Sequence, residues 1–429
     1  MSTDHSAAAE AYSRAVDDSV LFVGDPLTAA AEALAADPDL VLAHTLLAMY
    51  NLLGNNRTGL AEALAAIEAA EAAAGGANRR ELGHIAATRA WYEGDFAAAS
   101  LHWDTVLTEY PRDLFALQMG HLLDFYMGNA FNLRDRVARV LPAWSADTPL
   151  RDAVSGMYAF GLEEAGNYRQ AEDEGRRAVE ADKRDSWAAH AVAHVMEMEV
   201  RPEEGEAWLT ATSNGWGCGN FTVHNWWHLA LYRLDLGDFA GALTLYDGSI
   251  HYPGQEFVEE LLDAAALLWR MDLIGQDVGD RWQTLAEHWL HLKDDGRYAF
   301  NDIHGMMCFV RSGRRDAAAS LVAALEQEAS GTKTTSGMAR DIGLPVARAI
   351  GAFADEDYGQ VVELLLPIRY DTRLFGGSHA QRDVLAQTLI VAAIRDGQKS
   401  LAHALLAERA ATKRPTEASF TSQARAALA

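Results

Sequence analysis

The sequence has few cysteines, few prolines and a deficit of basic residues. Its 429 residues include two cysteines, ten prolines, and 36 Lys and Arg against 61 Asp and Glu, a formal net charge of −25. Two cysteines do not make a secreted disulfide scaffold, so we expect a reducing compartment and predict a cytoplasmic protein. The excess negative charge disfavours contact with phosphate backbones and anionic lipid, so we expect no nucleic-acid partner and no membrane partner.

Long apolar runs and familiar enzyme signatures are missing as well. No uncharged apolar stretch of about 18 residues occurs, so no membrane span is expected, and the first residues do not predict a signal peptide. The signatures GxGxxG, GxxxxGK[ST], GxSxG and HExxH are absent, which argues against dinucleotide-binding, P-loop, α/β-hydrolase and zinc-protease chemistry. Hydrophobic residues still make up 49% of the chain, which is enough for a substantial core.

Apolar residues recur at the spacing of amphipathic helices. Two segments illustrate it, with the faces Leu27, Ala30, Ala31, Leu34 and Leu60, Ala63, Leu64, Ile67. Spacings of three and four place such residues on one side of a helix. No run of alternating β-branched residues bounded by hairpin turns accompanies them. The fold class is therefore predicted to be all-α.

A turn signal of glycine, Asp or Asn, and an aromatic residue recurs along the chain. It occurs at 94–96, 166–168 and 237–239, and weaker copies centre on Gly128, Arg201–Gly205, Gly313, Tyr358 and Gly397. A glycine at a helix end adopts a left-handed conformation that a β-carbon penalises. Helical hairpins repeating in this way are typical of tetratricopeptide repeats. We predict a TPR-like helical-hairpin superhelix, an α-solenoid, forming a single domain over 1–429 and partly closed around a central pocket.

Residues 185–310 are predicted to form the core of that pocket, because ionisable side chains gather there at helical spacing. His190 and His194 lie four residues apart in an apolar segment, and Glu197 follows three residues later. His224 and His228 repeat the four-residue spacing, which brings side chains onto one helix face. Further candidates are Asn225, Asp263, Asp302 and His304, with Trp216, Trp226, Trp227 and Trp269 as walls of a ligand site.

Three interpretations of this cluster remain open from the residues. Imidazole and carboxylate are ordinary ligands of Zn²⁺, Fe²⁺ and Mn²⁺, so the metal ligands would be His190, His194, Glu197, His224 and His228. Without a metal, the histidines, Asp302 and His304 would transfer protons near neutral pH. The third interpretation is structural: the histidines are core residues satisfied by hydrogen bonds, and the tryptophans are core packing.

The motifs of this stretch resemble those of the tetratricopeptide repeat protein 38 family, which includes the StaR-like proteins of glycopeptide-antibiotic gene clusters. They are His190-x-x-x-His194-Val-x-Glu197, His224-Asn-x-Trp-His228, Tyr246-Asp247, Asp263-x-x-x-Leu-Leu-Trp-Arg270, Gly279-x-Arg281-Trp282 and Asn301-Asp302-x-His304. The resemblance extends from the N-terminal helices to about residue 410. It implies a helical, repeat-like fold and, for the antibiotic-cluster members, an oxidative or hydroxylating role.

Two functions follow from these patterns. The first is an enzyme that acts on a small aromatic or polar organic molecule, with a metal as Lewis acid or oxygen activator, or with histidine as acid and base. The second is a scaffold that binds a peptide or protein partner in the concave groove of the superhelix. Exposed apolar helices at the repeat ends would favour a homodimer.

Overall fold

The computed structural model describes residues 1–217 and 219–428, and these residues form an all-α protein with no β-strand among them. Cys218 lies outside the described residues. Contacts group the chain into two compact units: unit 1 is Met1–Val192 with Asn214–Phe221, and unit 2 is Ala193–Ser213 with Thr222–Ala429. Whether the two units make one repeat domain over 1–429 stays a prediction.

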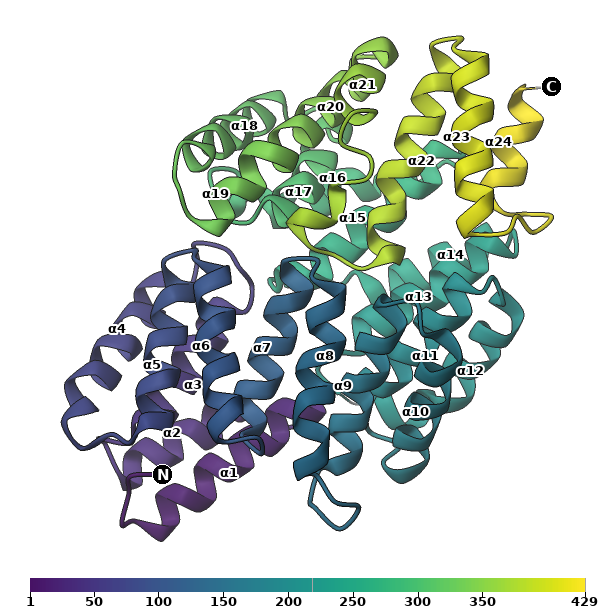
Figure 1. Ribbon diagram of the computed structural model, residues 1–429. Helices are drawn as coiled ribbons and strands as arrows, with labels where there is room; N and C mark the ends of the chain where they lie inside the picture. Colours follow the sequence, from purple (N-terminus) through teal and green to yellow (C-terminus); the bar gives the residue numbers. More distant parts are fainter. Residues whose placement is uncertain (218, 429) are drawn as a thin grey trace. The chain divides into compact units, whose positions relative to one another are not determined.

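Unit 1 consists of helices joined by short turns (Figure 1). Its elements are α1 (Ser6–Leu21), α2 (Pro26–Ala36), α3 (Val41–Leu52), α4 (Leu60–Ala72), η1 (Ala73–Gly76), α5 (Arg79–Tyr92), α6 (Phe96–Glu109), α7 (Leu114–Tyr126), α8 (Ala130–Val140), η2 (Leu141–Ala143), α9 (Arg151–Glu164) and α10 (Tyr168–Ala181). Two helices contribute residues to both units, α11 (Ser186–Met198) and α12 (Pro202–Trp216).

Unit 2 holds the remaining helices, among them two short π-helices, η3 and η5. Its elements are α13 (Thr222–Asp235), α14 (Phe239–Leu245), η3 (Tyr246–Ile250), α15 (Val258–Leu273), α16 (Arg281–Trp289), η4 (Leu290–Leu292), α17 (Ala299–Arg311), α18 (Arg315–Ala329), α19 (Thr334–Met338), η5 (Ala339–Gly343), α20 (Leu344–Ala354), α21 (Tyr358–Leu365), η6 (Thr372–Phe375), α22 (His379–Arg395), α23 (Lys399–Thr412) and α24 (Phe420–Leu428).

The predicted turn signal is confirmed in physical detail. Gly94, Gly166 and Gly237 have φ of 78°, 80° and 79°, the left-handed conformation in which a helix ends. The residue that follows can cap the next helix: Asp95 accepts a hydrogen bond from the Ala98 backbone N–H. Where the signal lacks glycine, an ordinary residue takes the left-handed position, Val200 before the turn at 201–205 and Glu356 before Tyr358.

Helices that are consecutive in sequence pack against each other within each unit, as α5 does with α6 and α9 with α10 (Figure 1). The alanines that follow the turns are fully buried, which allows the backbones of neighbouring helices to approach closely; they are Ala99, Ala171 and Ala242. The aromatic residue of the first turn, Phe96, is also fully buried and packs on Trp91. The turn residues therefore set both the direction and the spacing of the helices.

One predicted helix face is wrong. In α2 the face was expected to include Leu27 and Ala31, but Leu27 is 43% exposed and Ala31 is exposed as well. The buried face of α2 is formed by Pro26, Ala29, Ala30 and Ala33. Because alanine occurs on every side of this helix, its periodicity does not define one apolar face, and close packing on α1 selects the smallest residues.

Unit 2 is organised around α15, which is buried on all sides. Almost every residue of α15 from Leu261 to Met271 is covered, by contacts with α13, α16, α17 and α22. A helix surrounded in this way can carry a polar side chain only if neighbouring helices supply partners for it. Among the described residues, none of the helices is both long and apolar enough to cross a bilayer.

The glycine turns predict a measurable stability difference. Gly166→Ala should lower the free energy of unfolding by about 1–2 kcal/mol, the cost of a left-handed residue with a β-carbon. A β-carbon at Gly166 meets no atom within 4 Å, so the loss would come from the backbone alone. Gly75→Ala is the control, because Gly75 has equally open surroundings without a positive φ. Urea unfolding should show no loss for this control; equal losses for both variants would contradict the account.

Candidate functional site

Helix α11 carries the first histidines of the predicted site and begins with a buried cap. Asp185 Oδ1 accepts a hydrogen bond of 2.8 Å from the Ala188 backbone N–H, which satisfies a helix N–H that has no partner within the helix. Residues 188–195 are all alanine, valine or histidine, and they are buried throughout. The helix therefore delivers His194 into the interior of unit 2 as a side chain with no access to solvent.

Three histidines of unit 2 converge. His194 on α11 and His224 and His228 on α13 each offer one ring nitrogen, and these nitrogens lie within 4.8 Å of one another. The ring centroids of His194 and His228 are 4.4 Å apart, and those of His224 and His228 are 4.9 Å apart. The four-residue spacing on α13 and the packing of the helices thus bring three of the five predicted metal ligands together.

Asp263 on α15 forms a hydrogen bond with one ring of this cluster. Its Oδ2 lies 2.7 Å from Nδ1 of His224, and its carboxylate is buried. Burial raises the pKa of Asp263, and the neighbouring His224 opposes that rise. When the carboxylate is ionised, Nδ1 of His224 donates the hydrogen bond, so the lone pair of that ring resides on Nε2. Asp263 acts here through His224 and is not itself one of the converging groups.

Burial keeps the other two imidazoles neutral. It lowers the pKa of both His194 and His228 well below the ordinary value, and the charge of neighbouring rings lowers the two values further. Arg270 and Lys413 contribute to the same effect on His228. At neutral pH these rings therefore carry lone pairs, which is the form of histidine that binds metals.

Trp227 and Arg270 form the wall beside His224. The indole of Trp227 stacks on the His224 ring at a centroid distance of 5.2 Å, and the Arg270 guanidinium lies 5.4 Å from the indole centroid. Arg270 donates to the backbone carbonyl of Ala380 at 2.6 Å and to that of Ala266 at 3.0 Å. A cation over an indole face is stabilised by the ring quadrupole, more so away from water.

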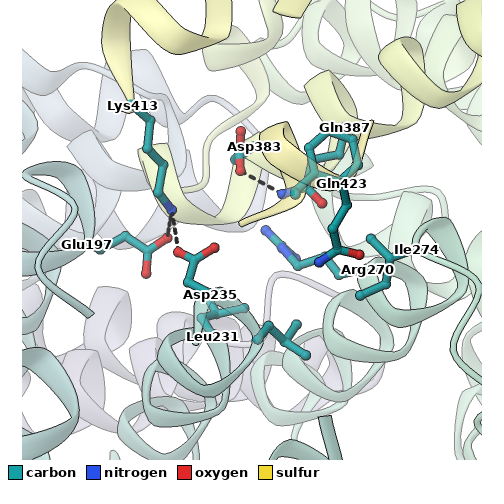
Figure 2. A pocket seen from close by; sticks show the side chains of 11 residues that line it. Glu197, Leu231, Asp235, Arg270, Ile274, Asp383, Gln387, Lys413 and Gln423 are labelled. Atoms are coloured by element: carbon teal, nitrogen blue, oxygen red, sulfur yellow. Dashed lines mark hydrogen bonds and ion pairs between the residues drawn. The ribbon is translucent and has the colours of Figure 1, made fainter. Parts of the chain in front are cut away.

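A small cavity lies one turn further along the same helices (Figure 2). It is lined by Glu197 of α11, Leu231 of α13 and Arg270 of α15, together with residues of α22 and α24. Its volume is about 30 Å³, which suits a single water molecule. Phe420 and Gln423 of α24 are among its lining residues.

Glu197 does not join the histidines. Its Oε1 lies 2.7 Å from Nζ of Lys413, and the same ammonium is 3.3 Å from Oδ2 of Asp235 (Figure 2). Glu197 is therefore held in an ion pair in this structure, and its role as a metal ligand stays a prediction. The reason is long-range: Lys413 comes from the chain that follows α23, and its charge holds the carboxylate on the cavity side.

A second ion pair, between Asp383 of α22 and Arg409 of α23, lies beside the cavity. Arg409 contacts Asp383 at 2.6 Å and 3.0 Å and donates to Thr421 Oγ1 at 2.5 Å. Gln387 donates to the same carboxylate at 2.7 Å. The Arg409 guanidinium and the other basic groups beside it hold the pKa of Asp383 well below its usual range. Opposite charges are thus paired around the cavity, which offsets the cost of burying them.

Asp302 and His304 lie on α17 outside the converging group. Asp302 Oδ1 accepts from the Gly296 backbone N–H at 3.2 Å, and His304 Nδ1 donates to the Phe300 carbonyl at 2.7 Å. Burial lowers the pKa of His304 to about 4. The structure gives both side chains local partners that organise the start of α17, and it does not bring them to the three histidines.

His190 and Trp216 belong to unit 1. His190 precedes His194 by one turn of α11, and its ring packs among Phe160, Trp187 and Phe221. Trp216 is fully buried at the end of α12. Gly215 lies within α12, where a β-carbon would lie 1.9 Å from the Lys183 carbonyl oxygen.

Most of the remaining candidate site residues are buried. Asn225 and Trp227 are fully buried, and Trp226 is half-buried. Trp269 donates its indole N–H to Thr388 Oγ1 at 2.9 Å, which identifies it as a packing residue between α15 and α22. The motif pairs Tyr246-Asp247 and Gly279-x-Arg281 meet, because Arg281 binds Asp247 through two nitrogens at 2.5 Å and 2.8 Å.

Asp383 and Lys413 were not predicted as neighbours of the site, and Arg270 was named only as the end of the motif that begins at Asp263. Arg270 gave a usable signal, since a cation that ends the apolar run Leu267-Leu268-Trp269 needs an acceptor when the helix is buried. Lys413 gave none, because it lies in a polar segment more than 200 residues from Glu197. Its role follows only from the tertiary fold.

The cap of α11 predicts a pH-dependent stability. Burial raises the pKa of Asp185 to about 7, so its contribution to stability is complete below about pH 4 and is lost as the pH rises through 7. Asp185→Asn keeps a capping oxygen without the charge. Between pH 5 and pH 8 the free energy of unfolding of the variant should rise relative to that of the wild type by at most about 2.7 kcal/mol, because only the two pH units below the folded-state pKa contribute, at 1.36 kcal/mol each.

Asp182, three residues earlier in the chain, is a control for which the opposite pH dependence is expected. The hydrogen bond from Arg184 lowers the pKa of Asp182, so Asp182→Asn should lose stability relative to the wild type as the pH rises. A pH-independent difference between Asp185→Asn and the wild type would contradict the assignment of a buried, protonated cap.

The chain matches no model of a known protein family. The resemblance to the tetratricopeptide repeat protein 38 family, carried by the motifs between residues 190 and 304, therefore stays a prediction. What the cluster can bind follows from the residues themselves: three converging imidazoles, two of them kept neutral by burial, and one oriented by a carboxylate.

Proposed function

We propose that unit 2 holds a divalent metal ion at His194, His224 and His228 and that the protein is a metal-dependent enzyme for a small polar or aromatic molecule. One observation carries the proposal: ring nitrogens from two helices, α11 and α13, lie within 4.8 Å of one another in a buried setting. Ligand bonds of about 2 Å from three nitrogens to one ion are compatible with that spacing.

The donor set fits Zn²⁺ best and Fe²⁺ or Mn²⁺ next. Three protein ligands with one open position are the usual arrangement of catalytic zinc, and imidazole is a common ligand of all three metals. Asp263 supplies the outer carboxylate that typically orients a metal-binding histidine. The ion would act as a Lewis acid that polarises an oxygen of the bound molecule.

The electrostatics favour metal binding over metal-free proton transfer. A general base works best when its pKa lies near the working pH, and burial lowers the pKa of His194 and His228 well below that range. The same neutral form is the one that ligates a metal. His224 remains as the oriented ring, with Trp227 stacked on it as the wall against which a planar ligand would pack.

The helical frame around the site is proposed to be a TPR-like superhelix related to the tetratricopeptide repeat protein 38 family. Support comes from the left-handed glycines at 94, 166 and 237 and from the packing of helices that follow each other in sequence. His190, one turn before His194 on the same helix, stays a predicted ligand. The alternative of a peptide-binding scaffold is decided by the metal experiments below.

Metal content is the first test. Protein purified without chelator should carry metal, and each of His194→Gln, His224→Gln and His228→Gln should carry about one equivalent less than the wild type, because each removes a ligand nitrogen. His304→Gln is the matched control, a buried histidine of the same unit outside the group. Elemental analysis gives the stoichiometry, and circular dichroism checks the fold of each variant.

Two results would contradict the proposal. The first is wild-type protein that neither contains metal nor binds added Zn²⁺, Fe²⁺ or Mn²⁺. The second is a folded His228→Gln variant that retains the same metal content as His304→Gln. Either would leave the histidines as structural residues and favour the scaffold.

Asp263 provides a graded test. Asp263→Asn keeps the shape of the side chain but removes the charge that orients His224, so metal affinity should fall by about 10- to 100-fold without being abolished. Asp272→Asn is the control on the same helix, because Asp272 is bound to Arg311 and Trp282 instead of a histidine. Competition with a chromogenic chelator measures both affinities; equal values for the two variants would remove Asp263 from the site.

A further inference from the structure

A second pair of histidines in unit 2 lies outside the site described above. His251 follows η3 and His288 lies on α16, and their ring centroids are 4.9 Å apart. His251 is nearly buried and His288 is half-buried, so the pair is at the edge of the interior. Both rings are tied to one residue, Gln255, through its side chain and its backbone.

The orientation of the Gln255 amide is fixed by its neighbours. Its side-chain nitrogen lies 2.9 Å from the carbonyl oxygen of Ile250 and 3.0 Å from Oε2 of Glu260. Both of these atoms accept hydrogen bonds, so the group facing them must be the NH₂ donor. The remaining atom, Oε1, is therefore an acceptor, and it lies 2.9 Å from Nδ1 of His251.

The oxygen atoms that face the two Nδ1 atoms determine the tautomer of both rings. Nδ1 of His251 faces the amide oxygen of Gln255, and Nδ1 of His288 faces the Gln255 backbone carbonyl at 2.8 Å. An oxygen that only accepts requires each Nδ1 to donate, so the neutral rings carry their lone pairs on Nε2. Among residues 1–217 and 219–428, no hydrogen-bond partner is assigned to either Nε2.

We propose that His251 and His288 bind a divalent transition-metal ion through their Nε2 atoms, at a site separate from the three-histidine group. A carbonyl oxygen behind each ring is the arrangement that fixes the tautomer and raises the basicity of a metal-binding histidine. Imidazole selects zinc, copper and nickel over magnesium and calcium, which prefer oxygen ligands. Water would fill the other positions, because neither His251 nor His288 belongs to a group of three possible metal ligands among the described residues.

The local backbone explains how the pair is assembled. η3 is a π-helix, and its wider turn ends at Ile250, which puts His251 in extended conformation directly before the turn that contains Gln255. Single-turn π-helices occur often at functional sites. Glu260, bound to Gln255 and to the Tyr252 hydroxyl, adds a negative charge behind the site.

The test uses the full chain with the first site removed. In the double variant His194→Gln/His228→Gln, calorimetric titration with Zn²⁺ in excess Mg²⁺ should still show one bound zinc per chain, because magnesium occupies only the non-specific carboxylates. Adding His288→Asn should weaken this binding at least about tenfold, the lower end of the loss seen when even an outer-shell partner is removed. Asn can keep a donor near the Nδ1 position while it removes Nε2.

The control is His291→Ala in the same background, an exposed histidine on the adjacent η4. It should leave the zinc affinity unchanged. If His288→Asn does not fold, His251→Asn takes its place with the same expected loss. The proposal is overturned if the double variant binds no zinc, or if the folded Asn variant binds zinc as tightly as the His291→Ala control. Neither outcome bears on the three-histidine site, which is absent from all of these proteins.

Discussion

The hydrogen bond between His224 and Asp263 is the interaction on which the chemistry of unit 2 depends. It joins α13 to the fully buried helix α15 at 2.7 Å and decides which nitrogen of His224 carries the lone pair. His194 and His228 are placed by the packing of α11 and α13, and burial keeps them neutral. The carboxylate of Asp263 orients the one ring of the three that it contacts.

The cationic groups of unit 2 are kept one turn away from these rings. Lys413 is held by Glu197 and Asp235, and Arg409 by Asp383, so the charges around the small cavity are compensated in pairs. Arg270 has carbonyl acceptors and the face of Trp227 instead of a close carboxylate. The positive charges of Arg270 and Lys413 still disfavour protonation of His228, so at neutral pH the rings of His194 and His228 offer lone pairs to an ion.

The fold class and the cluster could be predicted from the sequence because both depend on local spacing. The glycine turns follow from backbone conformation, and the pairs His190/His194 and His224/His228 follow from the helical period. Long-range packing explains the rest: Glu197 faces Lys413, Asp302 and His304 bond within their own helix region, and the alanine-rich α2 buries a different face. The fixed tautomers of His251 and His288 required coordinates, since they depend on Gln255 meeting two acceptors at once.

Diffraction at the zinc absorption edge, from crystals grown with Zn²⁺, tests the central claim most directly. The account predicts an anomalous peak at bonding distance, about 2 Å, from one nitrogen each of His194, His224 and His228, with Asp263 still bound to His224 Nδ1. Three imidazoles hydrogen-bonded to protein or water, in a crystal whose zinc lies only elsewhere, would contradict it.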